Sequence, residues 1–297
     1  MLHVYSCTTT ARSSRLLTSL QVASMSSSHT LALTLPFHTQ FSSRCAILRS
    51  SVNKNTQRSF VTMNGNGDTP DNLDLIFEQK HSLRSKIRRA LKSMDPIQRS
   101  HEDNMIQDIV LQAPWFRSSD SICAYITCDA LREVSTSRIL SAFLTDPSND
   151  YKRLYVPRVE DKNSNMRMLK ITNVNDLVAS SMNILEPEPV DRSGNMREDV
   201  MQATEPVDLF ILPGLAFDRS GRRLGRCGGY YDLFLRNYRQ RAEEKSWKQP
   251  LLVALCYSVQ IMDEGSIPVT PFDIPVDALV SPAGFIPISP SAFKWSC

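Results

Sequence analysis

Glycine, arginine and aspartate gather in one short segment of this chain, residues 213–232 (PGLAFDRSGRRLGRCGGYYD). Five of the ten glycines in the 297-residue sequence lie there, together with Arg222, Arg223 and Arg226, and Asp232 ends the segment. Glycine lets the backbone approach a bulky anion closely, and guanidinium groups bind phosphate oxygens in pairs. A helix that begins near Gly228 would add its free N–H groups and the positive end of its dipole. The segment predicts a phosphate-binding loop with a metal-binding carboxylate beside it.

The spacing within this segment differs from that of the two best-known nucleotide-binding loops. The pattern GxxxxGK[ST] does not occur in the sequence, and GRCGGY lacks the GxGxxG spacing of a dinucleotide-binding loop. A glycine-rich link between a strand and a helix is also often only a tight turn. A structural turn with a solvated basic face therefore stays open beside the phosphate-binding interpretation.

The runs before and after the segment indicate where it lies in the fold. Residues 207–213 (VDLFILP) are strongly apolar, which is typical of a central strand covered on both faces. Residues 229–242 place aromatic and leucine side chains on one stripe at helical spacing. Because ligands of α/β proteins bind at the carboxyl ends of parallel strands, we expect a binding site directly after this strand.

Helices and strands alternate along the rest of the chain. Apolar residues recur at helical spacing from about 75 to 94, and Asp95-Pro96 predicts a stop followed by a capped helix through about 112. A further helix is predicted at 135–144, and strands are predicted at 121–127, 153–157, 166–171, 251–257 and 278–281. This order predicts an α/β fold, a three-layer α/β/α single domain at 75–282 with a largely parallel, mixed sheet, followed by a loose tail at 283–297.

The first 67 residues contain no Asp or Glu, carry six Lys or Arg residues and are rich in Ser and Thr. This composition predicts an organellar transit peptide over residues 1–62 and a flexible segment over residues 63–74. Arg58-Ser-Phe60 is typical of a matrix-type cleavage site, which favours the mitochondrial matrix over the plastid stroma. A disordered tail without an address stays the third option. The apolar runs here are too short and interrupted to span a bilayer.

The charge of the chain changes sign without this leader. Of 34 Lys and Arg residues 28 remain, against 31 acids, which leaves a net charge of about −3. This balance speaks against a nucleic-acid binder that uses the basic helix at residues 80–92, as does the lack of interleaved aromatic residues there. Five scattered cysteines remain without CxxC or Cys/His spacing, so we expect neither disulfides nor a zinc site.

The string LAFDRSGRRLGRCGGYYD closely resembles the signature of the 5-formyltetrahydrofolate cyclo-ligases, also called 5,10-methenyltetrahydrofolate synthetases. The resemblance covers about residues 78–282 and continues through KHSLR (80–84), REV (132–134), YVPR (155–158), NILEP (183–187) and FDIPVD (272–277). It implies a monomeric ligase of one-carbon folate metabolism that depends on ATP and Mg²⁺. Such an enzyme converts 5-formyltetrahydrofolate, as its polyglutamate, to 5,10-methenyltetrahydrofolate and releases ADP and phosphate.

The resemblance also implies which residues bind ATP. They are Lys80 and Arg84, together with the glycine-rich loop: Arg223, Leu224, Gly225, Arg226, Cys227, Gly228, Gly229, Tyr230 and Tyr231. Lys80 and Arg84 are four residues apart and so share one face of a helix. From spacing alone they would be one edge of a solvated basic face, because four more basic residues follow them.

Asp232 and Asp273 are the magnesium ligands that the resemblance implies. Mg²⁺ is a hard ion that prefers carboxylate, water and phosphate oxygens. By position alone, Asp232 complements the dipole in the first turn of a helix. Asp273 alone would be a turn residue, and Asp277 is the neighbour that could be mistaken for it.

The folate-binding residues implied by the resemblance are Cys128, Glu133, Met182, Arg226 and Tyr230, and Tyr231 would lie near the nucleotide. The family residue that matches Glu133 contacts the pterin ring, whose N–H donors need an acceptor. Alone, Glu133 would be an ordinary exposed acid. Cys128 and Met182 would be apolar pocket walls, although either could belong to the core.

Arg226 and Tyr230 are the implied catalytic residues, and Cys227 beside them departs from the family pattern, which has glycine there. A side chain at a position with positive φ costs about 1 kcal/mol or somewhat more. This departure leaves open a folate- or nucleotide-binding homologue without turnover. A phosphosugar isomerase on a similar α/β fold is a further alternative.

Overall fold

The middle of the sheet is occupied by β6, Leu209–Leu212, whose four residues are all buried. The computed structural model describes residues 70–146, 151–180, 184–226 and 228–295. In it β6 belongs to a seven-stranded sheet of order β12-β11-β9-β6-β1-β2-β3. The other strands are β1 (Ser121–Ala124), β2 (Arg153–Val159), β3 (Met166–Ile171), β9 (Leu251–Leu255), β11 (Ala278–Ser281) and β12 (Gly284–Pro287). The five inner strands are parallel and the two edge strands antiparallel, so the predicted largely parallel, mixed sheet is confirmed.

The helices lie close to where the sequence predicts them. They are α1 (Pro70–Ser93), α2 (Pro96–Gln112), α3 (Pro114–Arg117), α4 (Ser137–Thr145), α5 (Tyr230–Glu244) and α6 (Pro290–Phe293). Asp95 caps α2 as predicted, because its carboxylate accepts hydrogen bonds from the amides of Ile97 and Gln98. None of the described helices has the length and apolar character that crossing a lipid bilayer requires.

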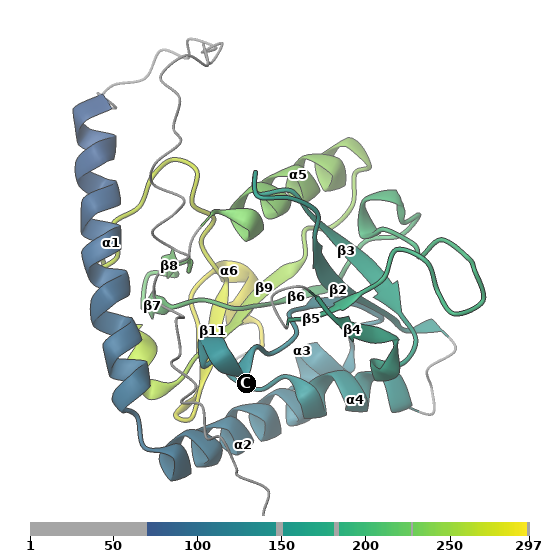
Figure 1. Cartoon of the computed structure of the whole chain (residues 1–297), viewed down its shortest axis with the longest axis horizontal. Helices are drawn as coiled ribbons and strands as arrows, with labels where there is room; N and C mark the ends of the chain where they lie inside the picture. Colours follow the sequence, from purple (N-terminus) through teal and green to yellow (C-terminus); the bar gives the residue numbers. More distant parts are fainter. Residues whose placement is uncertain (1–69, 147–150, 181–183, 227, 296–297) are drawn as a thin grey trace, which may run out of the picture. The chain divides into compact units, whose positions relative to one another are not determined.

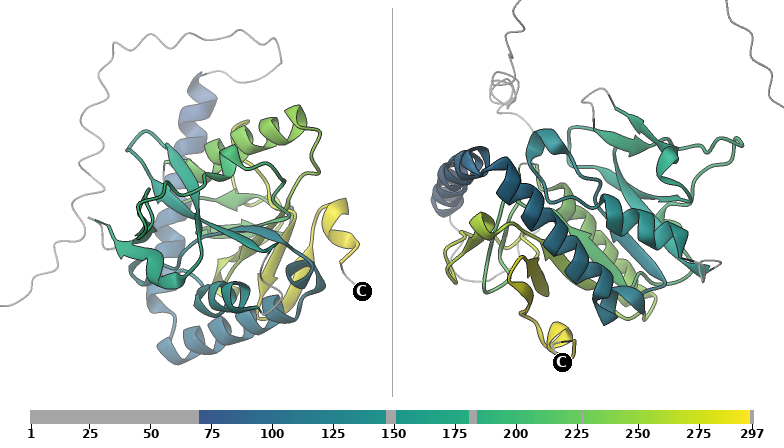
Figure 2. Two further views of the ribbon diagram at one scale, coloured as in Figure 1. Left: turned by 90° about the vertical axis from the view of Figure 1, so that its right-hand side faces the viewer. Right: turned by 90° about the horizontal axis from the view of Figure 1, so that it is seen from below.

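Successive side chains of the central strands enter two different cores. Ile122 of β1 and Ile211 of β6 belong to the core that includes residues of α1, α2 and α4. Cys123 of β1 and Phe210 of β6 belong to the core that includes residues of α5. Figures 1 and 2 show α2 and α4 on one face of the sheet and α5 on the other. The predicted three-layer α/β/α fold is therefore confirmed.

The direction of the chain through the sheet reverses between β1 and β6. From β1 the chain continues outward to β2 and β3, whereas from β6 it continues the other way to β9, β11 and β12. The loops at the carboxyl ends of β1 and β6 therefore diverge, and a sheet of this kind usually binds its ligand in the resulting crevice. We call this place the strand-order reversal. Residues 213–232 follow β6 directly.

Two small sheets were not predicted from the sequence. β7 (Ala216–Asp218) pairs with β8 (Arg223–Leu224) as a hairpin and with β10 (Ile261–Met262). β4 (Leu177–Ala179) pairs with β5 (Leu185–Pro187). These strands have only two or three residues, which is too short for a periodic pattern to be recognised.

The structure corrects two of the predicted boundaries. The flexible segment expected at 63–74 is helical from residue 70 on, because α1 begins there. The loose tail expected at 283–297 contains β12 and α6: β12 returns antiparallel to β11, and Phe285 stacks on Trp115 with ring centroids 5.6 Å apart. The Pro and Ser content of this segment predicts a loose tail, whereas its pairing with the buried strand β11 decides its structure. The predicted transit peptide, residues 1–62, lies outside the described residues.

Candidate active site

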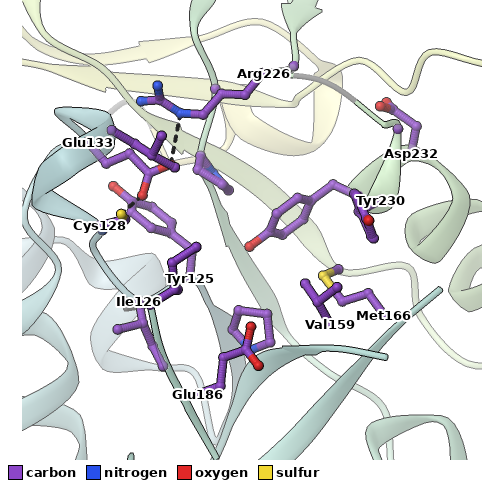
Figure 3. Close-up of a pocket in the computed structure, with 18 of the residues that line it drawn as sticks. Tyr125, Ile126, Cys128, Glu133, Val159, Met166, Glu186, Arg226, Tyr230 and Asp232 are labelled. Carbon is purple, nitrogen blue, oxygen red and sulfur yellow. Dashed lines mark hydrogen bonds and ion pairs between the residues drawn. The ribbon is translucent and has the colours of Figure 1, made fainter. Parts of the chain in front are cut away.

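A pocket of about 190 Å³ lies at the strand-order reversal. Its walls come from the segments after β1 and β6, from β2, β3 and β5, and from the first turn of α5 (Figure 3). The polar and reactive side chains in these walls include Cys128, Glu133, Glu186, Arg226, Tyr230 and Asp232. The fold thus gathers separate motifs of the sequence around one space.

The hairpin β7–β8 shapes the first half of the segment 213–232. Asp218 is fully buried in its turn and accepts hydrogen bonds from the amides of Ser220 and Arg222. Gly221 has φ +85°, and a Cβ at this position would lie 2.6 Å from the carbonyl oxygen of Val276. Only glycine fits such an approach. The hairpin turns the chain back so that the residues after β8 reach the pocket.

The second half of the segment leads into α5 through Gly228 and Gly229, which have φ +61° and +70°. A Cβ on Gly228 would lie 2.6 Å from the ring of Tyr230, so glycine lets this ring pack against the link. α5 begins without a side-chain cap, which leaves the amides of its first turn available to an anion. Cys227 lies outside the described residues.

Arg226 and Glu133 form an ion pair in the pocket, with Nε of Arg226 2.9 Å from Oε1 of Glu133. The other carboxylate oxygen of Glu133 accepts a hydrogen bond of 3.0 Å from the amide of Cys128. Burial raises the pKa of Glu133 by more than Arg226 and this amide lower it. Nη2 of Arg226 is buried and has no hydrogen-bond partner among the described residues. Arg226 therefore keeps a donor for a ligand.

A second ion pair joins Arg223 to Asp232, with Nη2 and Oδ1 2.8 Å apart. The same carboxylate oxygen accepts a hydrogen bond of 3.0 Å from the amide of Ile274. Asp232 lies in the first turn of α5, where a negative charge also complements the helix dipole. The pair thus fixes α5 to β8 and to the segment that carries Asp273.

A third ion pair joins α1 to that segment, with Nζ of Lys80 2.5 Å from Oδ2 of Asp273. The same oxygen accepts hydrogen bonds from the amide and the hydroxyl of Thr270. Burial alone would raise the pKa of Asp273, but the hydrogen bonds from Lys80 and Thr270 lower it below its usual value. Lys80 is itself buried, at 5% exposure, so it is not part of a solvated basic face.

The two candidate metal acids fit a magnesium ion that is bound together with phosphate. The two acids are held near each other, because Asp232 accepts a hydrogen bond from the amide of Ile274, the residue directly after Asp273. In the described part of the chain, Oδ2 of Asp232 and Oδ1 of Asp273 accept no hydrogen bond. No cluster of three or more His, Cys, Asp or Glu residues occurs in that part. One or two carboxylates plus phosphate oxygens is the usual donor set for Mg²⁺.

A profile of the 5-formyltetrahydrofolate cyclo-ligase family matches residues 76–282. The chain belongs to this family. The mitochondrial 5-formyltetrahydrofolate cyclo-ligase of Arabidopsis thaliana is 61% identical over 236 residues, which are 79% of this chain and 85% of that protein. The 5-formyltetrahydrofolate cyclo-ligase of Mus musculus is 30% identical over 204 residues, 68% of this chain and 92% of that protein. Among solved structures, the 5,10-methenyltetrahydrofolate synthetase of Aquifex aeolicus is 25% identical with a TM-score of 0.54 and covers 70% of this chain and 92% of its own.

The cyclo-ligase motif KHSLR contacts the glycine-rich loop directly. Nε of Arg84 donates to the carbonyl of Gly225 at 2.8 Å, and Nη2 of Arg88, one turn further on, donates to the carbonyl of Arg226 at 2.9 Å. α1 thereby holds two successive peptide groups of the loop. Arg88 is one of the four basic residues after Arg84 that the spacing alone assigns to a solvated face. Its contact with the loop depends on the fold and cannot be predicted from that spacing.

Most of the residues predicted for the two substrates lie around the pocket. Cys128 and Tyr230 line it, and the hydroxyl of Tyr230 donates to the carbonyl of Asp161 at 2.9 Å. Tyr231 lines it too, with the guanidinium of Arg223 5.9 Å from its ring centroid. Leu224 is fully buried in the core, and its carbonyl accepts a hydrogen bond from the amide of Leu215, so it lies behind the pocket rather than in its wall. Met182 lies outside the described residues.

Glu186 is a pocket residue to which sequence reasoning gave no role. It belongs to the motif NILEP, which supports the family resemblance, but its strand, β5, has only three residues. In such a short strand, no alternation of apolar and polar residues in the sequence can indicate that the glutamate is buried. In the structure it is 8% exposed and lines the pocket.

Proposed function

We propose that this chain converts 5-formyltetrahydrofolate to 5,10-methenyltetrahydrofolate with consumption of ATP and with Mg²⁺ as the metal ion. Family membership and the names of the relatives support this activity. The observation that carries the proposal is the position of Arg226 at the strand-order reversal, paired with Glu133 and with a buried Nη2 that no described residue binds. A guanidinium donor of this kind suits a phosphate or carbonyl oxygen.

The reaction must activate a poor electrophile. The formyl carbon on N5 is an amide carbon, and its oxygen leaves poorly. Transfer of the γ-phosphoryl group of ATP to that oxygen breaks the bond between the bridging oxygen and the γ-phosphorus and releases ADP. N10 then attacks the formyl carbon and loses its proton, and the bond from carbon to oxygen breaks as phosphate leaves. The new bond between carbon and N10 closes the ring.

Such a transfer depends on positioning and on neutralisation of charge more than on a covalent enzyme group. Lys80 and Arg226 would provide positive charge to the phosphates, and Arg84 would fix the loop by its bond to Gly225. Asp232 and Asp273 would hold Mg²⁺, which binds phosphate oxygens and neutralises their charge. These residues are mutually connected, because α1 and α5 both bind the segment 270–274.

The folate would lie in the pocket of Figure 3. Glu133 would accept hydrogen bonds from the pterin ring, although both of its oxygens already accept one from the protein. Tyr230 would orient the folate, and Cys128, with Met182, would provide apolar wall. The substrate would be polyglutamylated, since cellular folates carry such tails, and the enzyme would act as a monomer.

The direct test is to incubate the full chain with 5-formyltetrahydrofolate and Mg·ATP and follow the absorbance of methenyl-folate. The expected result is a product that requires ATP and Mg²⁺ and forms with ADP in equal amounts. Reactions without ATP, or with a chelator in place of Mg²⁺, are the controls. Formation of product without ATP would contradict the proposed reaction. Binding of folate without any consumption of ATP would instead identify a non-catalytic homologue, which the cysteine at position 227 makes a specific alternative.

We also propose that the protein is imported into mitochondria. The acid-free, Ser-rich leader and the name of the Arabidopsis thaliana relative support this location. Residues 1–62 fused to a fluorescent protein should direct it to the mitochondrial matrix. Accumulation in plastids would assign the leader to the plastid stroma instead.

A further inference from the structure

The pocket contains a second buried glutamate, Glu186, on the wall opposite Arg226 and Glu133. Figure 3 shows its carboxylate pointing into the pocket from β5. Glu186 is 8% exposed and Pro187 after it is buried, whereas Leu185 before it is 45% exposed and the next acid, Glu188, is on the surface. The strand therefore turns one acid inward, although a buried carboxylate is costly unless it is compensated.

β5 is held in place by Arg158 of β2, whose Nη1 donates to the carbonyl of Pro187 at 2.9 Å. The charge of Arg158 is shared with another acid, because its Nε lies 3.5 Å from Oε1 of Glu160. Glu186 itself forms no ion pair with any described residue. Burial raises the pKa of Glu186 by more than Arg158 and the amide of Val159 lower it, and the charge of Glu160 raises it further.

The two glutamates of the pocket thus differ in what they can offer a ligand. Each oxygen of Glu133 accepts one hydrogen bond, from Arg226 or from the amide of Cys128, and its charge is paired with that of Arg226. Glu186 forms no ion pair with a described residue, and the nearby cation, Arg158, is paired with Glu160. A negative charge left in this state is stabilised most by a ligand that carries positive charge.

The proposed reaction creates such a charge. The folate core of 5-formyltetrahydrofolate is neutral, whereas the core of 5,10-methenyltetrahydrofolate is a cation delocalised over N5, the bridging carbon and N10. The O-phosphorylated intermediate already carries positive charge on N5 and the formyl carbon, before N10 is bonded. A fixed negative charge beside the ring stabilises these species more than the substrate, and only such differential stabilisation accelerates a chemical step.

We propose that Glu186 is the counter-charge for the cationic folate core formed on ring closure. This inference rests on the proposed function and assigns a residue to its charge-forming steps. Arg226 serves the oxygen and phosphate side of the substrate, and Glu186 serves the ring side from the opposite wall. Arg226 would thus stabilise the negative charge on the phosphate, and Glu186 the positive charge on the folate ring.

The test compares the binding of the two folates in the absence of ATP. The dissociation constants of 5-formyltetrahydrofolate and 5,10-methenyltetrahydrofolate are measured with the full chain by rapid mixing, before the methenyl compound hydrolyses. Glu186→Gln keeps the shape of the side chain and removes its charge, and the exposed Glu188→Gln is the matched control. We expect Glu186→Gln to weaken binding of the methenyl compound about tenfold and of the formyl compound less than about threefold.

Turnover provides a second readout. In Glu186→Gln the kcat should fall while the KM for 5-formyltetrahydrofolate stays near that of the wild type, and Glu188→Gln should change neither. Glu186→Asp, which keeps the charge, should retain the preference for the methenyl compound. Thermal unfolding checks that all three variants are folded, and Gln at a buried site without an ion pair should not destabilise the protein.

The outcomes separate this inference from the proposed function. Equal weakening of both folates in Glu186→Gln, or weakening of neither, would overturn the role of Glu186 as counter-charge. In that case a wild-type chain that still produces methenyl-folate would leave the proposed function intact. A wild-type chain that binds neither folate would overturn both.

Discussion

Arg226 and Glu133 are 93 residues apart in the sequence, and an ion pair of 2.9 Å joins them in the pocket. Glu133 belongs to the segment after β1 and Arg226 to the segment that follows β6, so the pair bridges the two loops that diverge at the strand-order reversal. Only Nε of the guanidinium is used for this pair. Arg226 is therefore held by the protein through Nε, while its buried Nη2 donates to no described residue.

Arg226→Lys should lower kcat by about 10²- to 10³-fold, because lysine keeps the charge but loses the planar fork that binds Glu133 and a ligand oxygen together. The measurement is ATP-dependent formation of methenyl-folate. Arg222→Lys is the matched control, since Arg222 lies in the same segment but donates to the carbonyls of Gly265 and Ile267. An Arg226→Lys variant with wild-type kcat would remove Arg226 from the chemistry.

Asp232→Asn should lower turnover at least about 100-fold, because it removes one of the two charges proposed to hold Mg²⁺. It should also lower the free energy of unfolding by about 1–3 kcal/mol, since it leaves the charge of Arg223, whose side chain is 3% exposed, without its partner. Titration of activity with Mg²⁺ and urea unfolding measure the two effects.

Asp277→Asn separates the metal role of Asp232 from a structural one. Asp277 accepts a hydrogen bond of 2.8 Å from the amide of Leu252, so its loss should affect stability and leave the dependence on Mg²⁺ unchanged. Unchanged turnover and Mg²⁺ dependence in Asp232→Asn would refute the metal assignment.

The sequence predicts the layers of this fold well because they depend on long periodic patterns. The strand after 207 and the helix after 229 are recognisable from their own residues, and the loop between them is marked by its glycines. The strands of the small sheets are not recognisable, since each has two or three residues and is formed only through its partner. β12 was not predicted for the same reason, because it is formed only through its pairing with β11, which is a tertiary contact.

The candidate site divides in a similar way. The residues of the glycine-rich loop, Glu133 and the two candidate metal acids could be named from motifs. Their pairing could not, because Lys80 and Asp273 are 193 residues apart and nothing in either motif indicates the other. Glu186 was missed although its motif was noted, since burial of a single acid depends on how β5 packs against β2.

Gly228→Ala should raise the KM for 5-formyltetrahydrofolate and lower stability by about 1 kcal/mol or more, because φ is +61° and the new Cβ would lie 2.6 Å from the ring of Tyr230. Gly194→Ala is the control, since Gly194 has φ +85° but open space around its Cβ position. We expect it to lose similar stability without a change in KM. If both variants keep the wild-type KM, Tyr230 does not contact the folate.

Cys227→Gly should lower the KM for ATP. The family pattern has glycine at this position, between Arg226 and Gly228, and a side chain there competes with the close approach of phosphate to the backbone. Steady-state kinetics with varied ATP at saturating folate measure the effect. A higher KM for ATP in this variant would show that the rest of the loop is adapted to cysteine.

Asp273→Asn should lower the free energy of unfolding by about 1–3 kcal/mol at neutral pH, because it leaves the ammonium of Lys80 buried without its partner. The hydrogen bonds from Lys80 and Thr270 outweigh burial and lower the pKa of Asp273 below its usual 3.8. A carboxyl group with a lowered pKa stabilises the folded state above its unfolded pKa, and this contribution is lost as the pH falls through the folded pKa. Urea unfolding of the wild type and the variant should therefore show a constant difference at neutral pH that narrows below about pH 4. A difference that stays constant through that range would mean that the ionised carboxylate does not stabilise the contact between α1 and the segment 270–274.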